Sequence, residues 1–227
     1  MTEDVANKLR VFFSQFRILT YKKGETILRG DDTPQGVYFI KDGYVRIYSV
    51  FEDGRELTLN IFKPGSYFSM MWAISNIPNT YFFQSMVMSQ VQRAPREEVI
   101  EFIKKNPDVL FEFTQRILVG LDGLLTNVEH LLSGNAYQKI IATLFLSAKR
   151  FGQVTKQKRV LINIPLTHQD VANLAAMTRE TASITLKKLE RKGLISYRHQ
   201  LITINSLEKL REESLITKGN ADPTLAL

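Results

Sequence analysis

The sequence contains no cysteine and only three histidines among its 227 residues. The absence of cysteine excludes disulfides, thiolate catalysis, cysteine-bound iron–sulfur clusters and zinc–thiolate sites. The three histidines, His130, His168 and His199, lie far apart along the chain. We therefore expect neither a metal site nor an iron–sulfur cofactor.

Long apolar runs and common enzyme signatures are missing as well. No stretch of about 18 apolar residues occurs, so no membrane span is expected. The N-terminus, MTEDVANKLRVFF, is acidic and polar before it becomes apolar, unlike a secretory signal or a transit peptide. The sequence also has no phosphate-binding glycine loop, nucleophile elbow or histidine–carboxylate spacing. We expect a cytoplasmic protein that is not an enzyme.

The positive charge is concentrated in the C-terminal part of the chain. Residues 1–133 hold 15 Lys/Arg and 16 Asp/Glu, a net charge of −1, whereas residues 134–227 hold 15 and 7, a net charge of +8. These values sum to the +7 of the whole chain. Such asymmetry favours a polyanionic partner for the C-terminal part alone, although many basic domains are simply soluble.

The N-terminal part is rich in short β-patterned runs. A short amphipathic helix is expected over residues 1–14, and glycines then punctuate four runs at 36–40, 44–50, 57–62 and 81–88. The stretches KDGY and EDGR are typical of hairpin turns. Many short strands at this spacing predict a β-roll or jelly roll over residues 1–106.

A long helix is expected to follow this roll. Residues 96–105 predict one helix, and Pro107 opens another that extends to residue 133. An apolar stripe runs along it for about six turns, and it either covers the roll or packs against the same helix of a second chain. We favour dimerisation because an ~80-residue roll is too small to cover the whole stripe. The stripe consists of Leu110, Phe113, Ile117, Leu121, Leu124, Val128 and Leu131.

The C-terminal part carries the pattern of a winged helix-turn-helix. Asn135 is expected to cap a helix over residues 136–150, after a break at residues 133–135 that forms the domain boundary. Two short helices then begin after the caps Thr167 and Thr178, and the alternating run 194–204 predicts a hairpin, or wing. The fold class is therefore α+β, with a DNA-binding domain at 134–207 and a tail at 208–227.

One face of the second helix is expected to read base edges in the major groove of DNA. At 100° per residue, Ala182, Leu186 and Leu189 form a core row, so Ile184 must be exposed on the opposite side. The reading residues are Glu180, Ser183, Ile184 and Lys187, flanked by Arg179. Contacts to phosphates are expected from Lys187, Lys188, Arg198 and the capped helix starts at Thr167 and Thr178. His168 is either a solvated neighbour of the cap or a further phosphate contact.

Residues 166–204, LTHQDVANLAAMTRETASITLKKLERKGLISYRHQLITI, resemble the DNA-binding domain of the CRP/FNR transcription regulators. The segment KKGETILRGDDTPQGVYFIKDGYVRIYSVFEDGRELTLNIFKPGSYF resembles that family's cyclic-nucleotide-binding-like roll. The order of roll, long helix, hinge and winged helix also matches. The resemblance implies a homodimer that binds a pseudo-palindromic site in promoter DNA and acts on RNA polymerase. The alternative is a ligand-sensing module that binds RNA.

The chain departs from the family where cyclic-AMP members hold their nucleotide. The Gly-Glu pair that holds the ribose falls at Ser69-Met70 here, and the Arg-Ser pair that holds the phosphate falls at Thr80-Tyr81. Without a cation a buried phosphate would stay unpaired, so we do not expect cyclic AMP. Either an apolar small molecule binds there, or side chains fill the site and no effector is used. The candidate lining is Ser69, Met70, Met71, Trp72, Thr80, Tyr81, Leu124 and Leu125.

The recognition helix departs from the family as well. The reading triplet of many members ends in arginine, whereas this chain has Ile184, and the turn glycine of the family is replaced by Ala176. An aliphatic side chain cannot make the bidentate contact that arginine makes with guanine. We therefore expect a base preference that differs from that of arginine-bearing relatives.

Overall fold

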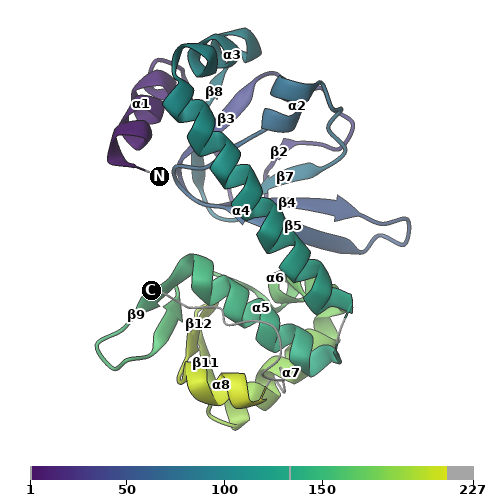
Figure 1. Cartoon of the computed structure of the whole chain (residues 1–227). Coiled ribbons are helices and arrows are strands. Elements are labelled where there is room, and N and C mark those ends of the chain that lie inside the picture. Colours follow the sequence, from purple (N-terminus) through teal and green to yellow (C-terminus); the bar gives the residue numbers. More distant parts are fainter. Residues whose placement is uncertain (1, 133, 214–227) are drawn as a thin grey trace. The chain divides into compact units, whose positions relative to one another are not determined.

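The computed structural model describes residues 2–132 and 134–213. At His130 it describes the backbone alone. The chain divides into two compact units, one ending at Leu125 and the other beginning at Thr126. This division falls inside the long helix rather than at the predicted break around residue 134. The predicted order of roll, long helix and winged helix-turn-helix is confirmed (Figure 1).

The first unit is built on two antiparallel four-stranded sheets. Their orders are β1-β8-β3-β6 and β2-β7-β4-β5. Its strands are β1 (Ile18–Tyr21), β2 (Thr26–Leu28), β3 (Val37–Asp42), β4 (Val45–Val50), β5 (Glu56–Phe62), β6 (Tyr67–Phe68), β7 (Phe82–Ser85) and β8 (Ser89–Ala94). Its helices are α1 (Glu3–Ser14), α2 (Met70–Ser75), α3 (Arg96–Lys105) and the first part of α4 (Pro107–Leu132).

The KDGY and EDGR turns of the first unit connect different kinds of strand pair. The EDGR turn closes the hairpin of β4 and β5, as predicted. The KDGY turn does not form a hairpin, because β3 pairs with β6 and β8 whereas β4 pairs with β5 and β7. It carries the chain from one sheet to the other. Gly43 has a φ of +89°, and a Cβ there would lie 2.3 Å from the Ser89 hydroxyl, so the crossing requires glycine.

Two apolar clusters hold the first unit together. One lies between the sheets and comprises Leu28, Tyr38, Ile40, Val45, Phe68, Phe83 and Val91. The other brings side chains of the helices against β3 and β8, and it comprises Val5, Leu9, Phe13, Val37, Phe39, Ala73, Ala94, Val99, Ile103, Val109 and Phe113. The start of α4 therefore belongs to the roll, which anchors the long helix at its N-terminal end.

The apolar stripe of α4 divides into a buried start and an exposed remainder. Phe113 is only 3% exposed, and its ring centroid lies 4.3 Å from that of Tyr67. Its assignment to a dimer interface is therefore wrong, because the roll already covers it. Further along, Ile117 is 59% and Leu121 50% exposed. Leu110, Leu124 and Val128 are also exposed, and Leu131 is partly buried.

The second unit combines helices with a small antiparallel sheet of order β11-β12-β10-β9. Its elements after α4 are α5 (Ala136–Phe151), β9 (Gly152–Val154), β10 (Val160–Ile162), α6 (His168–Leu174), α7 (Arg179–Arg191), β11 (Ile195–Arg198), β12 (Leu201–Ile204) and α8 (Leu207–Glu213). No helix within residues 2–132 and 134–213 is both long and apolar enough to span a membrane.

Helix α8 was not expected from the sequence. It occupies the beginning of the predicted tail, and Leu210 is fully buried against the second unit. Glu213 accepts hydrogen bonds from the Tyr137 hydroxyl at 2.9 Å and from the Lys192 ammonium at 2.7 Å. The second unit therefore extends at least to Glu213, beyond the predicted limit of 207. The remainder of the predicted tail, residues 214–227, lies outside the described residues.

Candidate nucleic-acid interface

The helix pair α6–α7 begins with two side-chain caps that the sequence predicted. The Thr167 hydroxyl accepts from the Asp170 amide at 3.1 Å, and Asp170 accepts from the Thr167 amide at 2.8 Å. This reciprocal capping box fixes the start of α6. The Thr178 hydroxyl accepts from the Thr181 amide at 3.2 Å at the start of α7. Both caps are thus confirmed, and Thr167 uses its hydroxyl and amide within α6.

The turn between the two helices contains an alanine in an unusual conformation. Ala176 has a φ of +50°, in the left-handed region that favours glycine. Its side chain is exposed, so the conformation meets no obstacle beyond the strain of the backbone itself. Alanine thus adopts a left-handed conformation at the position where the family has glycine.

Helix α7 has one buried and one exposed row, as its periodicity predicted. Ala182, Leu186 and Leu189 are buried in the core of the second unit. Ile184 on the opposite side is 69% exposed, and Glu180 and Lys187 are exposed beside it. These three side chains make no hydrogen bond or ion pair with the described residues. They form the exposed face of α7, and it is available to a partner.

Ser183 differs from the other predicted reading residues because its hydroxyl is engaged. The Oγ of Ser183 lies 3.0 Å from Nδ1 of His168 on α6. His168 also packs on Tyr197 of β11, with ring centroids 4.8 Å apart. His168 therefore joins both helices and the wing, and it is more than a solvated neighbour of the cap.

The wing is tied to the start of α6 by hydrogen bonds from its first strand and from its loop. The Tyr197 hydroxyl donates to the Leu166 carbonyl at 3.0 Å, and the Leu166 amide donates to the Gln200 carbonyl at 2.7 Å. Arg198 pairs with Leu201 across the two-residue loop of His199 and Gln200, both of which have positive φ. Such a loop matches the type I′ turns that suit tight hairpins. Arg198 is exposed beside this loop.

The predicted phosphate contacts on α7 differ in how firmly they are held. The Lys188 ammonium lies 4.9 Å from the centroid of the Tyr137 ring on α5, and Lys192 lies 5.4 Å from the same ring. Cations over an aromatic face are attracted by its quadrupole, so Tyr137 holds Lys188 against its own unit. Lys187 is exposed without such a partner among the described residues.

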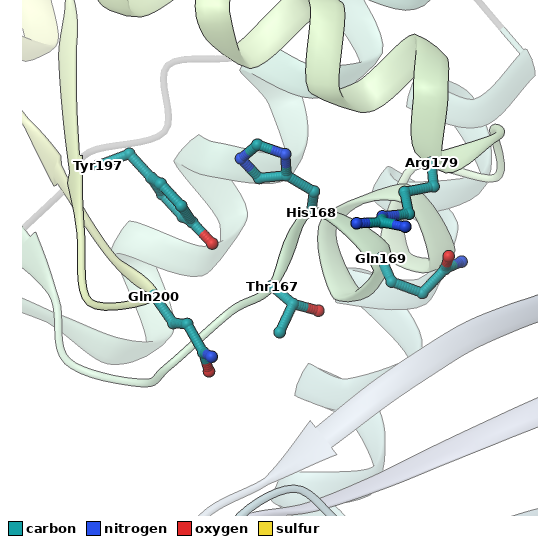
Figure 2. A pocket seen from close by; sticks show the side chains of 6 residues that line it. All are labelled: Thr167, His168, Gln169, Arg179, Tyr197 and Gln200. Atoms are coloured by element: carbon teal, nitrogen blue, oxygen red, sulfur yellow. The ribbon is translucent and has the colours of Figure 1, made fainter.

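A hollow of about 450 Å³ lies beside the start of α6. Figure 2 shows the side chains that surround it, drawn from α6, α7 and the wing. Sequence reasoning had named three of its residues as DNA contacts, Thr167, His168 and Arg179, but had missed the other three. The full lining is Thr167, His168, Gln169, Arg179, Tyr197 and Gln200. Tyr197 and Gln200 become neighbours of α6 only when the wing folds onto it, which no local sequence signal indicates, whereas Gln169 directly follows His168 on α6.

The electrostatics of this region disfavour charge on His168. Partial burial lowers the pKa of the His168 imidazole, and the nearby cations Arg179 and Lys187 lower it further, against an opposing effect of Glu190. On the wing, burial raises the pKa of the Tyr197 phenol, and the Asp170 carboxylate adds to this increase. These surroundings favour the neutral form of the His168 ring over the imidazolium form.

The residues predicted to line an effector pocket do not share one environment. Met70 and Trp72 pack against the helix-side core, and Tyr81 packs against the core between the sheets. Met71, Thr80, Leu124 and Leu125 are exposed. Ser69 precedes α2 in a left-handed conformation, with a φ of +69°. The Arg96 guanidinium of α3 donates to the Ala73 carbonyl at 2.7 Å, which fixes α2 against α3.

Comparison with known proteins agrees with this architecture. Residues 18–106 match the cyclic nucleotide-binding domain, and residues 138–213 match the Crp-like helix-turn-helix domain. The chain is 26% identical to the global nitrogen regulator of Nostoc sp. over 192 residues, which cover 82% of this chain and 84% of the relative. It is also 26% identical to the nitrogen fixation regulation protein FixK of Bradyrhizobium diazoefficiens, over 92% of this chain and 86% of that protein.

A solved structure shows the same fold over nearly the whole chain. The structure of FixK2 from Bradyrhizobium japonicum has a TM-score of 0.74 at 18% sequence identity, covering 87% of this chain and 96% of that one. The roll, the long helix and the winged helix-turn-helix thus occur in the order seen in the matched proteins. This chain belongs to the CRP/FNR family of DNA-binding transcription regulators.

Proposed function

We propose that this regulator acts as a homodimer that places α7 of each chain in the major groove of a pseudo-palindromic promoter site and acts there on RNA polymerase. The observation that carries the proposal is the exposed face of α7, whose opposite row is buried in the unit. A helix held in this way presents its polar side chains as a rigid set, which suits readout of base edges.

Glu180, Ile184 and Lys187 read the bases in this proposal. A glutamate can accept from the amino group of cytosine, and an aliphatic side chain can contact the methyl group of thymine. Arg179 adds a cation at the first turn of α7. Ser183 is removed from direct readout, because its hydroxyl contacts His168. It instead contributes by holding α6 and α7 in register.

Phosphate contacts come from residues around this reading face. Lys187 and Lys188 provide cations on α7, and Arg198 provides one on the wing. Thr167 and Thr178 are the N-caps of α6 and α7, and the capped helix starts are proposed to contact phosphates. The capping bonds of both threonines order the backbone in these places. Because these contacts release counterions from DNA, affinity for a duplex should fall steeply with salt.

The exposed part of the α4 stripe provides the dimer interface in this proposal. Ile117, Leu121, Leu124 and Val128 are exposed in the single chain, and Leu118, Val119 and Leu125 extend the apolar surface. Contiguous apolar surface of this kind is uncommon on monomeric proteins and marks interaction sites. A second copy of α4 offers the same apolar surface, so the pairing of two copies would bury the exposed apolar side chains of both helices.

The effector site is proposed to be filled by side chains, with cyclic AMP excluded as a ligand. Met70, Trp72 and Tyr81 are partly buried against the cores of the roll, which supports this view over an apolar pocket for a small molecule. The positions that align with the ribose- and phosphate-holding pairs of the family supply neither a carboxylate nor a guanidinium. Regulation would then depend on the abundance of the protein. No iron–sulfur cluster or other cofactor is required.

Binding to duplex DNA tests the regulatory proposal directly. Duplexes selected from a random library should share a two-fold symmetric motif, and their affinity should decrease strongly between low and moderate salt. A single-stranded RNA of the same length should bind more weakly. Affinity that is independent of salt, or a preference for the RNA, would contradict the proposal and favour an RNA-binding sensor.

Calorimetry and extraction test the effector proposal. Cyclic AMP and cyclic GMP should each produce no heat of binding when they are added to the protein. Saturable tight binding of either would contradict the proposed filling of the site. If denatured protein released a stoichiometric apolar molecule, the roll would be a sensor of that molecule instead.

A further inference from the structure

The hollow beside α6 has the composition of an anion site. Arg179 supplies a guanidinium, and Gln169 and Gln200 supply side-chain amides (Figure 2). The Thr167 hydroxyl donates to the Asp170 carboxylate at 2.6 Å, and the Gln169 amide uses one of its two N–H groups on Asn173 at 2.7 Å. None of the six lining residues is acidic. The carboxylates close by are engaged by protein donors: Asp170 accepts from Thr167, and Glu190 accepts from the Tyr197 amide at 3.2 Å. An anion entering the hollow therefore meets the Arg179 guanidinium and the side-chain amides directly, because neither carboxylate is among the lining residues.

Within the proposed function, the anion that reaches this surface is a backbone phosphate of duplex DNA. The hollow lies between the start of α6, the first turn of α7 and the wing, all within the second unit. Planar guanidinium groups and side-chain amides are frequent partners of phosphate oxygens in protein–DNA complexes.

His168 is the titratable group of this hollow. Its Nδ1 is fixed at 3.0 Å from the Ser183 hydroxyl, and its ring is held against Tyr197. The hydroxyl of Ser183 can donate to a neutral ring and can accept from a protonated one, so this contact survives a change of protonation. Nε2 makes no hydrogen bond to the described residues and remains available to a phosphate oxygen.

The charges that face His168 explain why a phosphate would change its protonation. In the free protein partial burial lowers the pKa of His168, and the cations of α7 lower it further. A bound phosphate would place a negative charge against the same ring and favour the imidazolium form. The charged and titratable groups packed around the ring are Asp170 on α6, Arg179, Lys187 and Glu190 on α7, and Tyr197 on the wing.

We propose that the hollow binds one backbone phosphate of duplex DNA and that His168 takes up one proton from the buffer as the phosphate arrives. Duplex binding then becomes stronger as the pH falls. No covalent bond changes, and the proton returns to the buffer when the DNA dissociates. The inference rests on the proposed DNA-binding function, which it extends by naming a proton-linked contact.

Fluorescence anisotropy with the full chain and a labelled duplex of random sequence measures this linkage. At constant ionic strength the affinity should rise by roughly tenfold between pH 8 and pH 5.5. His168→Gln should flatten this dependence and keep the weaker affinity throughout. His168→Arg carries its charge at every pH, and it should therefore show strong binding that does not vary over this range.

The other two histidines provide matched controls, because the chain contains only three. His199→Gln and His130→Gln should each retain the pH dependence of the parent protein. If His168→Gln retains it instead, or if His199→Gln abolishes it, the assignment to His168 is wrong. Urea unfolding of each variant establishes that the second unit is still folded.

Two further measurements follow the proton itself. In NMR titrations the ring resonance that disappears in His168→Gln should report a higher pKa with duplex than without it. Calorimetry in buffers of different ionisation enthalpy should show uptake of up to one proton per chain. An unchanged pKa with normal duplex binding would overturn this inference alone. Failure of the duplex to bind at any pH would overturn the proposed function and this inference with it.

Discussion

The hydroxyl of Tyr197 donates a hydrogen bond to the carbonyl of Leu166, at a distance of 3.0 Å. This bond joins the first strand of the wing to the residue that precedes the cap of α6. Leu166 is itself buried, so its carbonyl has little access to water. The wing is therefore a structural support for the helix pair.

Replacement of Tyr197 by phenylalanine should weaken this support. The variant loses one hydrogen bond and leaves a buried carbonyl without it, so the free energy of unfolding should decrease by about 1 kcal/mol. Urea unfolding of the full chain measures this change. Because the ring of Phe would still pack on His168, the affinity for duplex should decrease only a few-fold. An unaltered unfolding midpoint would show that the bond does not stabilise the wing.

The dimer should depend on the exposed part of α4 and not on its buried start. Ile117→Glu combined with Leu121→Glu places charges in the proposed interface, so analytical ultracentrifugation should show a monomer. These side chains are exposed in the single chain, so the roll should remain folded.

Phe113→Ala is the matched comparison for the α4 variants. It creates a cavity in the helix-side core and should cost about 3–5 kcal/mol of unfolding free energy. A charged double variant that remains dimeric would place the interface elsewhere.

Ile184 should determine the preference at one base pair of each half-site. Ile184→Arg introduces a guanidinium that can bind guanine in a bidentate manner, a contact worth ~1–3 kcal/mol of discrimination. Library selection with this variant should therefore show guanine enriched at one symmetric pair of positions, where the parent selects weakly and prefers thymine. The side chain is exposed, so stability should not change. An identical selected motif would refute the placement of Ile184 in the groove.

Ala176→Gly should stabilise the second unit. A left-handed backbone costs a residue with a side chain roughly 1–2 kcal/mol, and glycine avoids this cost. The greater freedom of glycine in the unfolded chain offsets about 0.4–1 kcal/mol of the gain. A net increase of up to about 1 kcal/mol is expected in urea unfolding. Ala175→Gly is the control. Ala175 is fully buried and has a negative φ, so its replacement by glycine should destabilise the second unit.

The stability of the first unit should decline at alkaline pH in part through Tyr67. Burial raises the pKa of Tyr67 to about 12, which the Glu112 carboxylate favours and the Arg116 guanidinium opposes. Because the folded pKa lies above the unfolded one, this contribution is complete below about pH 10 and is lost as the pH rises towards 12. Tyr67→Phe should therefore lose less stability than the parent between pH 10 and 12. Urea unfolding at each pH compares them, and equal losses would contradict the assignment.

The sequence could predict features that depend on nearby residues. The capping box of Thr167 and Asp170 and the buried row of α7 follow from local spacing, and both are confirmed. The KDGY turn forms no hairpin although its sequence predicts one. A glycine turn has the same local pattern whether its two flanking strands pair with each other or with other strands. Which strands pair is decided by packing across the whole roll.

Contacts between distant segments explain the remaining differences. Phe113 falls on the same stripe as Ile117, and only the position of Tyr67 in the fold shows that the roll covers it. Helix α2 follows Ser69, which has a left-handed conformation and makes no capping hydrogen bond, so this serine does not act as the N-cap that its residue type suggests. The contact of His168 with Ser183 spans 15 residues and two helices, which no periodicity reveals.

The exposed face of α7 has a consequence for how the protein can change over time. Glu180, Ile184 and Lys187 make no bond within the described part of the chain, whereas Ser183 and the buried row hold the helix in place. Substitutions at those three positions alter the exposed face of α7 without destabilising the domain. Under the proposed readout by α7, new operator preferences can arise by single exchanges that leave folding intact, and engineered variants can be redirected at the same three positions.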